Sequence, residues 1–167
     1  MKSLLDYEGV SKTQNQIASE VWSTQKALPW YTVNGSEKSQ FPAATHMSDY
    51  TGFNYIPFPY GAAGTSNLTA SDIEPKVMAT INNGHGLLVC GRSYGNIKDH
   101  ASILPNYPAK EVGHWLACDG YKDNGATIWL VDPAKSDCVS WSGNITRYLS
   151  VSSSKLAAYA NARGIIW

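Results

Sequence analysis

The stretch that decides the fold reads Gly113-His114-Trp115-Leu116-Ala117-Cys118-Asp119-Gly120-Tyr121 and, after a short turn, Ile128-Trp129-Leu130-Val131-Asp132-Pro133. The two apolar runs flank Asn124-Gly125, a dipeptide that is the strongest short signal for a tight turn between antiparallel strands. We therefore predict a hairpin with His114 at the head of one strand and Asp132 at the tail of the next. The turn lies midway between the two side chains, so the hairpin should bring them back together.

Paired in this way, His114 and Asp132 form two thirds of a nucleophile–His–Asp arrangement. The carboxylate can accept a hydrogen bond from one imidazole nitrogen, which fixes the tautomer and leaves the other nitrogen free as a base. Such a base would activate a cysteine or serine nucleophile. The alternative is a histidine that only satisfies polar groups at a strand end, and both interpretations stay open until a nucleophile is found.

The three cysteines do not offer a convincing nucleophile. Cys118 is four residues after His114 on the same predicted strand, which separates the two by about 13 Å along the chain. Cys90 lies in an apolar run and fits a small core residue, and Cys138 follows the Asp132 strand on a polar turn. None of them begins a recognisable helix, where the pKa of a thiol would be lowered.

Metal and cofactor sites are not expected. His46, His85, His100 and His114 lie far apart, and no CxxC or HxxxH spacing supplies a chelating pair. The glycines near Gly61 are not followed by the GK[ST] of a phosphate loop. We therefore expect no cofactor and no metal.

The bulk composition describes a single domain of 167 residues, 43% of them hydrophobic and 16% charged. Thirteen basic residues balance thirteen acidic ones, so nothing points to nucleic acid as a partner. No apolar run approaches the roughly 18 residues that span a bilayer. The first residues do not form a signal peptide, although the abundance of Tyr, Trp, Ser, Asn and Gly suits a secreted or cell-surface protein.

The sequence predicts helices in the first half of the chain and an antiparallel meander in the second, an α+β organisation. Helices are expected at residues 1–8, from Thr13 as N-cap, at 41–49, and from Thr69 to Asn82-Asn83-Gly84. Strands are expected at residues 53–58, 86–90, 114–121, 127–132 and 139–141, with a long polar connection over 92–111. A last helix capped by Ser153 or Ser154 and a short strand after Gly164 close the chain.

The hairpin resembles that of the bacterial papain-like cysteine peptidases akin to the double-glycine leader peptidases. Their recurring pattern is a Gly-His-aromatic start, an apolar run, Gly-Tyr-Asp with a nearby Gly, and a later Asp-Pro. Segments over 5–18, 73–90 and 153–167 add weaker support. The resemblance implies a papain-like fold over 1–167, with N-terminal helices packed on a C-terminal antiparallel sheet, and a peptide or protein substrate. It implies that His114 is the general base and Asp132 its orienting partner, and we expect Trp115 and Trp30 beside a substrate cleft.

In that family the nucleophilic cysteine begins the first helix, and a glutamine shortly before it stabilises the oxyanion. Because Met1 to Leu5 match the middle of that helix, the resemblance places both residues upstream of Met1. We then expect either self-association or reliance on a complementing N-terminal segment. Three functions stay open: a peptidase domain seen without its nucleophile segment, an inactive relative that binds peptides or cell-wall material, and a papain-like acyl transferase or amidase.

Overall fold

The computed structural model describes residues 1–21, 28–32, 41–60, 67–94, 102–135 and 139–167. Its helices are α1 (Lys2–Tyr7), α2 (Gln14–Val21), α3 (Pro42–Thr51), α4 (Ala70–Asn82), α5 (Ser153–Ala160) and the short 3-10 helix η2 (Asp123–Gly125). Its strands are β1 (Pro57–Phe58), β2 (Leu87–Tyr94), β3 (Glu111–Lys122), β4 (Thr127–Val131), β5 (Tyr148–Ser152) and β6 (Gly164–Ile166).

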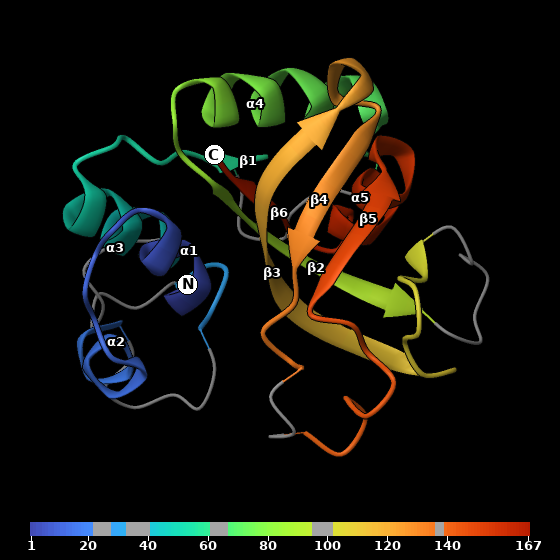
Figure 1. Cartoon of the computed structure of the whole chain (residues 1–167), viewed down its shortest axis with the longest axis horizontal. Helices are drawn as coiled ribbons and strands as arrows, with labels where there is room; N and C mark the ends of the chain where they lie inside the picture. The colour runs from blue at the N-terminus through green and yellow to red at the C-terminus, as the bar shows by residue number, and fades with distance from the viewer. Residues whose placement is uncertain (22–27, 33–40, 61–66, 95–101, 136–138) are drawn as a thin grey trace.

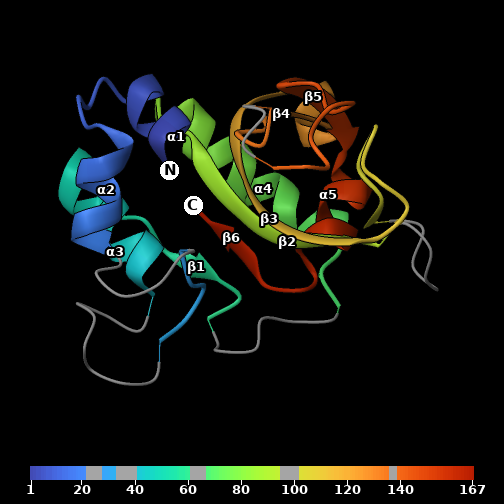
Figure 2. The same cartoon turned by 90° about the horizontal axis from the view of Figure 1, so that it is seen from below.

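These strands form a sheet in the order β1-β6-β2-β3-β4-β5, and each pairing between neighbours is antiparallel. Helices α1, α2 and α3 gather beside one part of the sheet, and α4 and α5 pack on it elsewhere (Figures 1 and 2). The helices are thus segregated from the strands rather than alternating with them. The predicted α+β class with an antiparallel sheet is confirmed.

Strand β2 separates two hydrophobic cores. Leu87 and Val89 belong to the core shared with α4 and α5, whereas Leu88 and Cys90 belong to the core shared with α1, α2 and α3. Successive side chains of a strand point to opposite faces, so a strand covered on both sides must be apolar at every position. This explains the continuous apolar run over 86–90.

Local signals at the helix ends act as the sequence predicts. Gly9 follows α1 with a φ of 71°, a left-handed conformation that glycine adopts without steric cost. The Thr13 amide donates to Gln16 Oε1 at 2.8 Å, and the Gln16 amide donates to Thr13 Oγ1 at 3.2 Å. Thr69 and Asp72 form the same reciprocal box at the start of α4. The predicted helix starts at these two threonines are confirmed.

The strand predicted over 53–58 is wrong for most of its length. Only Pro57 and Phe58 are paired as a strand, opposite Ile166 and Ile165. β6 is three residues long, so it offers β1 few backbone partners beyond two hydrogen bonds between Ile56 and Trp167 at 2.7 and 3.0 Å.

Three further boundaries differ from the prediction. β2 continues through Tyr94, because residues 92–94 pair with 111–113 and Arg92 reaches Glu111 in an ion pair at 3.0 Å. Residues 139–141 form a bend and a turn rather than a strand, and β5 takes the place beside β4. Helix α5 is capped by Ser152, whose side chain accepts from the Lys155 amide, one residue before the predicted cap.

Gly91→Ala is expected to lower the free energy of unfolding by about 2–3 kcal/mol. A Cβ atom at Gly91 would lie 2.2 Å from the carbonyl oxygen of Tyr159 and 2.5 Å from its ring, so backbone at the end of α5 must move. Gly113→Ala is the matched control, because its Cβ would find nothing closer than the Arg92 side chain at 3.8 Å. Urea unfolding followed by circular dichroism measures both variants, and equal stabilities would contradict the packing of α5 on β2.

Candidate active site

The β3–β4 hairpin brings His114 and Asp132 together. His114 Nε2 lies 2.8 Å from Asp132 Oδ1, and Asp132 follows directly on the last residue of β4. His114 is not at the head of its strand as predicted, because Glu111, Val112 and Gly113 already pair with β2. The turn between the strands is also longer than a two-residue loop, with η2 holding Asn124 in a left-handed conformation at φ 53°.

Asp132 is completely buried and accepts hydrogen bonds at both carboxylate oxygens. Oδ1 accepts from His114 Nε2 and from the Ala134 amide at 2.8 Å, and Oδ2 accepts from the Tyr107 hydroxyl. Burial opposes ionisation, but the bonds from His114, Tyr107 and Ala134 outweigh it and lower the pKa of Asp132. An ionised carboxylate can only accept, so Nε2 of His114 must donate, which leaves Nδ1 without a proton when the ring is neutral.

Tyr107 is a site residue that the sequence did not reveal. Burial, the neighbouring Tyr159 and the negative Asp132 raise the pKa of Tyr107, so its hydroxyl keeps the proton that it donates. Tyr107 lies within the stretch predicted as a long polar connection. A tyrosine there carries no sequence signal that it reaches a carboxylate 25 positions away.

Trp141 is a second residue that the sequence analysis did not single out. Its ring meets His114 edge-on at a centroid distance of 5.7 Å and lies 5.6 Å from the ring of Tyr107. On the other side the Tyr159 hydroxyl donates to the backbone oxygen of His114 at 2.7 Å. These contacts hold the imidazole in place through packing and backbone anchoring.

A cleft of about 480 Å³ opens beside His114. It lies between the start of α1, one side of α2 and the sheet. Its lining consists of Met1, Lys2, Ser3, Gln14, Asn15, Ile17, Ala18, Leu28, His114, Trp115 and Pro133. The cleft therefore brings the beginning of α1 and the histidine to one space, with both apolar and amide side chains on its walls.

Of the two tryptophans expected beside a cleft, Trp115 lines it and Trp30 does not. Trp115 lines the cleft, and its Nε1 donates to the Leu28 carbonyl oxygen at 2.9 Å. Trp30 is only 4% exposed and lies behind Trp115, with 6.1 Å between the ring centroids, and it is not part of the cleft lining. Trp30 thus supports the wall that Trp115 forms.

Cys90 and Cys118 are both buried. Burial raises the pKa of each thiol to about 12, which disfavours the reactive thiolate. Cys138 lies outside the described residues. Neither described cysteine lines the cleft beside His114.

Both buried thiols are expected to resist alkylation while the protein is folded. With pKa values of about 12, roughly one thiol in ten thousand is ionised at pH 8. We expect iodoacetamide to modify them at least about 10³-fold more slowly in buffer than in guanidinium chloride. Mass spectrometry of a Cys138→Ser variant follows only these two thiols. Fast labelling of either thiol in the folded protein would contradict the assignment.

No helix within the described ranges is long and apolar enough to cross a membrane. Among the same residues, no three side chains of the metal-ligating types come close enough to hold an ion.

Comparison with known families identifies a relationship over most of the chain. A family model described as the Peptidase_C39 like family matches residues 1–155, which include both His114 and Asp132. Neither the curated proteins nor the solved structures contain a match.

Proposed function

Because the chain belongs to the Peptidase_C39 like family of papain-like cysteine peptidases, we propose that residues 1–167 form a single papain-like peptidase domain. His114 is its general base, and Asp132 orients and stabilises that base. The observation that carries this proposal is the 2.8 Å contact between His114 Nε2 and the buried Asp132 carboxylate, at the wall of a cleft. The substrate is a peptide or protein.

The proposed chemistry uses the nitrogen that Asp132 leaves free. Nδ1 of His114 takes the proton of a cysteine thiol, and the thiolate attacks the carbonyl carbon of the scissile peptide bond. The imidazolium then gives that proton to the leaving amine, and a thioester forms. Water, deprotonated by the same nitrogen, hydrolyses the thioester and restores the thiol. Asp132 lowers the free energy of the imidazolium in both steps by its negative charge.

We propose that the nucleophile enters this cleft at its Met1 end and is not one of the two described cysteines. Met1, Lys2 and Ser3 line the same cleft as His114, whereas the thiols of Cys90 and Cys118 are buried away from it. As the family resemblance implies, this cysteine would precede Met1, either joined to it or supplied by another chain; Cys138 lies outside the described residues, so the experiment below tests it directly.

The deciding experiment compares residues 1–167 with a longer protein that includes any codons in frame ahead of Met1. Both are incubated with a fluorogenic peptide and with a peptidyl vinyl sulfone that alkylates nucleophilic cysteines. We expect hydrolysis and labelling only in the longer protein, at a cysteine before Met1. Hydrolysis and labelling at Cys138 in residues 1–167 would overturn the proposal, and so would a longer protein that contains an upstream cysteine but binds peptide without hydrolysis.

Peptide binding without hydrolysis is the behaviour expected of the alternative function, a catalytically inactive relative that binds peptides or cell-wall material. The observation that favours it is the burial of Cys90 and Cys118, which leaves His114 without a nucleophile among the described residues. In that case the longer protein as well as residues 1–167 would bind a peptide without hydrolysing it, with an affinity that vinyl sulfone treatment leaves unchanged.

A further inference from the structure

A second hollow lies on β4 and β5, away from the His114 cleft. It encloses about 360 Å³ and is lined by Asp119, Trp129, Leu130, Tyr148, Leu149 and Ser150. We call the four residues Asp119, Trp129, Tyr148 and Ser150 the aromatic hollow. Trp129 is 46% exposed and Tyr148 72%, which is unusual for rings of this size.

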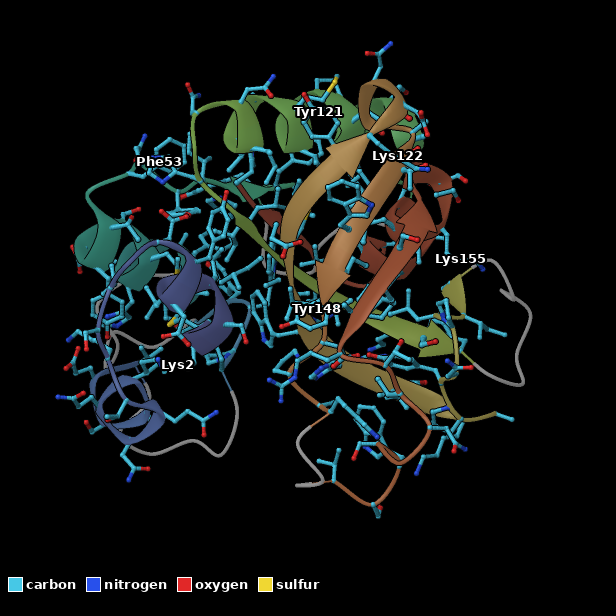
Figure 3. The ribbon with its side chains drawn as sticks, in the orientation of Figure 1. Lys2, Phe53, Tyr121, Lys122, Tyr148 and Lys155 are labelled. Carbon is cyan, nitrogen blue, oxygen red and sulfur yellow. The ribbon has the colours of Figure 1, made fainter. Side chains whose placement is uncertain are left out.

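The four residues lie together because of strand register. Trp129 pairs with Ser150, and Val131 pairs with Tyr148, so these side chains share one face of the sheet. Helices α1, α2 and α3 cover this face over β6, β2 and part of β3, and neither core includes Trp129 or Tyr148. In Figure 3, Tyr148 stands on β5 on the face turned away from α5.

The Trp129 ring is fixed in position by packing against the sheet. A Cβ atom at Gly120 would lie 2.4 Å from the Trp129 ring, so the ring packs directly on the backbone of its cross-strand partner. A β-bulge between Cys118 and Gly120 leaves Asp119 as the extra residue of β3, beside this ring. The tryptophan is thus fixed by close contact with the sheet while much of its surface faces solvent.

Asp119 is a half-buried carboxylate that lacks a cationic partner. Burial raises the pKa of Asp119, and no lysine or arginine of the described residues forms an ion pair with it. The nearest lysine in sequence, Lys122, reaches Asp123 instead, at 3.8 Å. A carboxylate that is partly withdrawn from water without a counter-ion carries an unfavourable free energy, which a bound cation would relieve.

We propose that the aromatic hollow binds the guanidinium group of an arginine side chain in a peptide. A guanidinium is planar, stacks on an indole ring and presents a fork of N–H donors that matches a carboxylate. Trp129 offers the ring, Asp119 the negative charge, and the hydroxyls of Tyr148 and Ser150 further acceptors at the rim. Because Asp119 is the only charged residue in the lining, the charge complementarity selects a cation.

The position of the aromatic hollow relative to the cleft indicates how many residues separate that arginine from the scissile bond. Ala117, Val131 and Tyr148 form one row across β3, β4 and β5, and Trp115, on the same face as Ala117, lines the cleft. Two strand spacings amount to about 10 Å, and the two residues from Ala117 to Trp115 add about 7 Å at right angles. The separation is then about 12 Å, which an extended peptide covers in about three to four residues. This placement rests on the proposed peptidase function, whereas guanidinium binding itself does not.

Binding is tested with two peptides, acetyl-Ala-Arg-Ala-amide and the same peptide with citrulline, which replaces one charged nitrogen of arginine by oxygen. The probe is the indole N–H resonance of Trp129, assigned with Trp129→Phe. We expect the arginine peptide to shift this resonance and to bind at least about fivefold more tightly than the citrulline peptide. In Asp119→Asn, which keeps the shape of the side chain, the two peptides should bind equally. The proposal would be overturned if the arginine and citrulline peptides bound equally to the unaltered protein, or if only the indole resonance of Trp115 shifted.

The predicted position of the arginine in the substrate can be tested separately, by kinetics, in any catalytically active form of the protein. Substrates with an arginine about three to four residues from the scissile bond should have at least about fivefold higher kcat/KM than citrulline substrates, and Asp119→Asn should abolish the difference. If a longer protein that carries a cysteine ahead of Met1 binds arginine but hydrolyses no peptide, the peptidase function is overturned and the guanidinium site still stands. Hydrolysis that is indifferent to arginine at every position would overturn the placement.

Discussion

Asp132→Ala is expected to lower the free energy of unfolding by about 3–5 kcal/mol. The substitution removes the common acceptor of three buried donors, namely His114 Nε2, the Tyr107 hydroxyl and the Ala134 amide. Each donor then loses its partner in a place where water does not replace it, because Asp132 is completely buried. Urea unfolding at pH 7, followed by tryptophan fluorescence and circular dichroism, gives the difference.

Asp132→Asn is the matched control, and its expected cost is smaller, about 1–2 kcal/mol. The Ala134 amide requires an oxygen at the Oδ1 position, so the asparagine oxygen should stay there and still accept from His114. The asparagine NH₂ group then faces the Tyr107 hydroxyl, which can rotate to accept. A loss as large as that of the alanine variant would mean that the charge, and not the set of hydrogen bonds, holds this part of the fold together.

A comparison of the unaltered protein with Asp132→Asn also gives the sign of a pH effect on stability. The pKa of Asp132 in the folded protein lies below the ordinary value of about 3.9, so the carboxylate stabilises the fold above that value. This contribution is lost as the pH falls through the lowered pKa of the folded state. The stability difference between the unaltered protein and Asp132→Asn should therefore shrink as the pH falls below about 4. A difference that grows as the pH falls below about 4 would contradict the lowered pKa of Asp132.

The hairpin was predictable because its signals are local. The Asn124-Gly125 turn and two apolar runs bring a histidine and an aspartate together without information from elsewhere in the chain. The capping boxes at Thr13 and Thr69 are local for the same reason, since each involves residues three positions apart.

The rest of the site depends on contacts between distant residues, which the sequence does not show. Tyr107 reaches Asp132 from a loop, and Trp141 reaches His114 from a turn in the stretch predicted as a strand. The boundary of β2 was missed because Arg92 and Tyr94 are polar or amphipathic and are held in the sheet by their partners on β3. Contacts between distant residues, and not local propensity, determine the positions of these side chains and the end of β2.

His114→Gln is expected to lower kcat/KM about 10³–10⁴-fold in a form of the protein that carries its cysteine nucleophile. Glutamine can still donate to Asp132, so the buried carboxylate keeps a partner and the variant should fold. It has no basic nitrogen to take the thiol proton. The loss should appear in kcat with KM nearly unchanged, because His114 acts on the proton transfer rather than on substrate binding.

The pH dependence of thiol alkylation separates loss of the base from a distorted site. A free cysteine ionises with a pKa of about 8.5, so above about pH 9.5 the nucleophile forms its thiolate without help. The alkylation rate of His114→Gln should therefore fall far below that of the unaltered protein at pH 6 and approach it at pH 9.5. Because Trp141 packs edge-on against the imidazole without taking part in proton transfer, Trp141→Phe should show no such pH-dependent gap. Equal alkylation of the His114→Gln and unaltered proteins at pH 6 would show that another group activates the thiol.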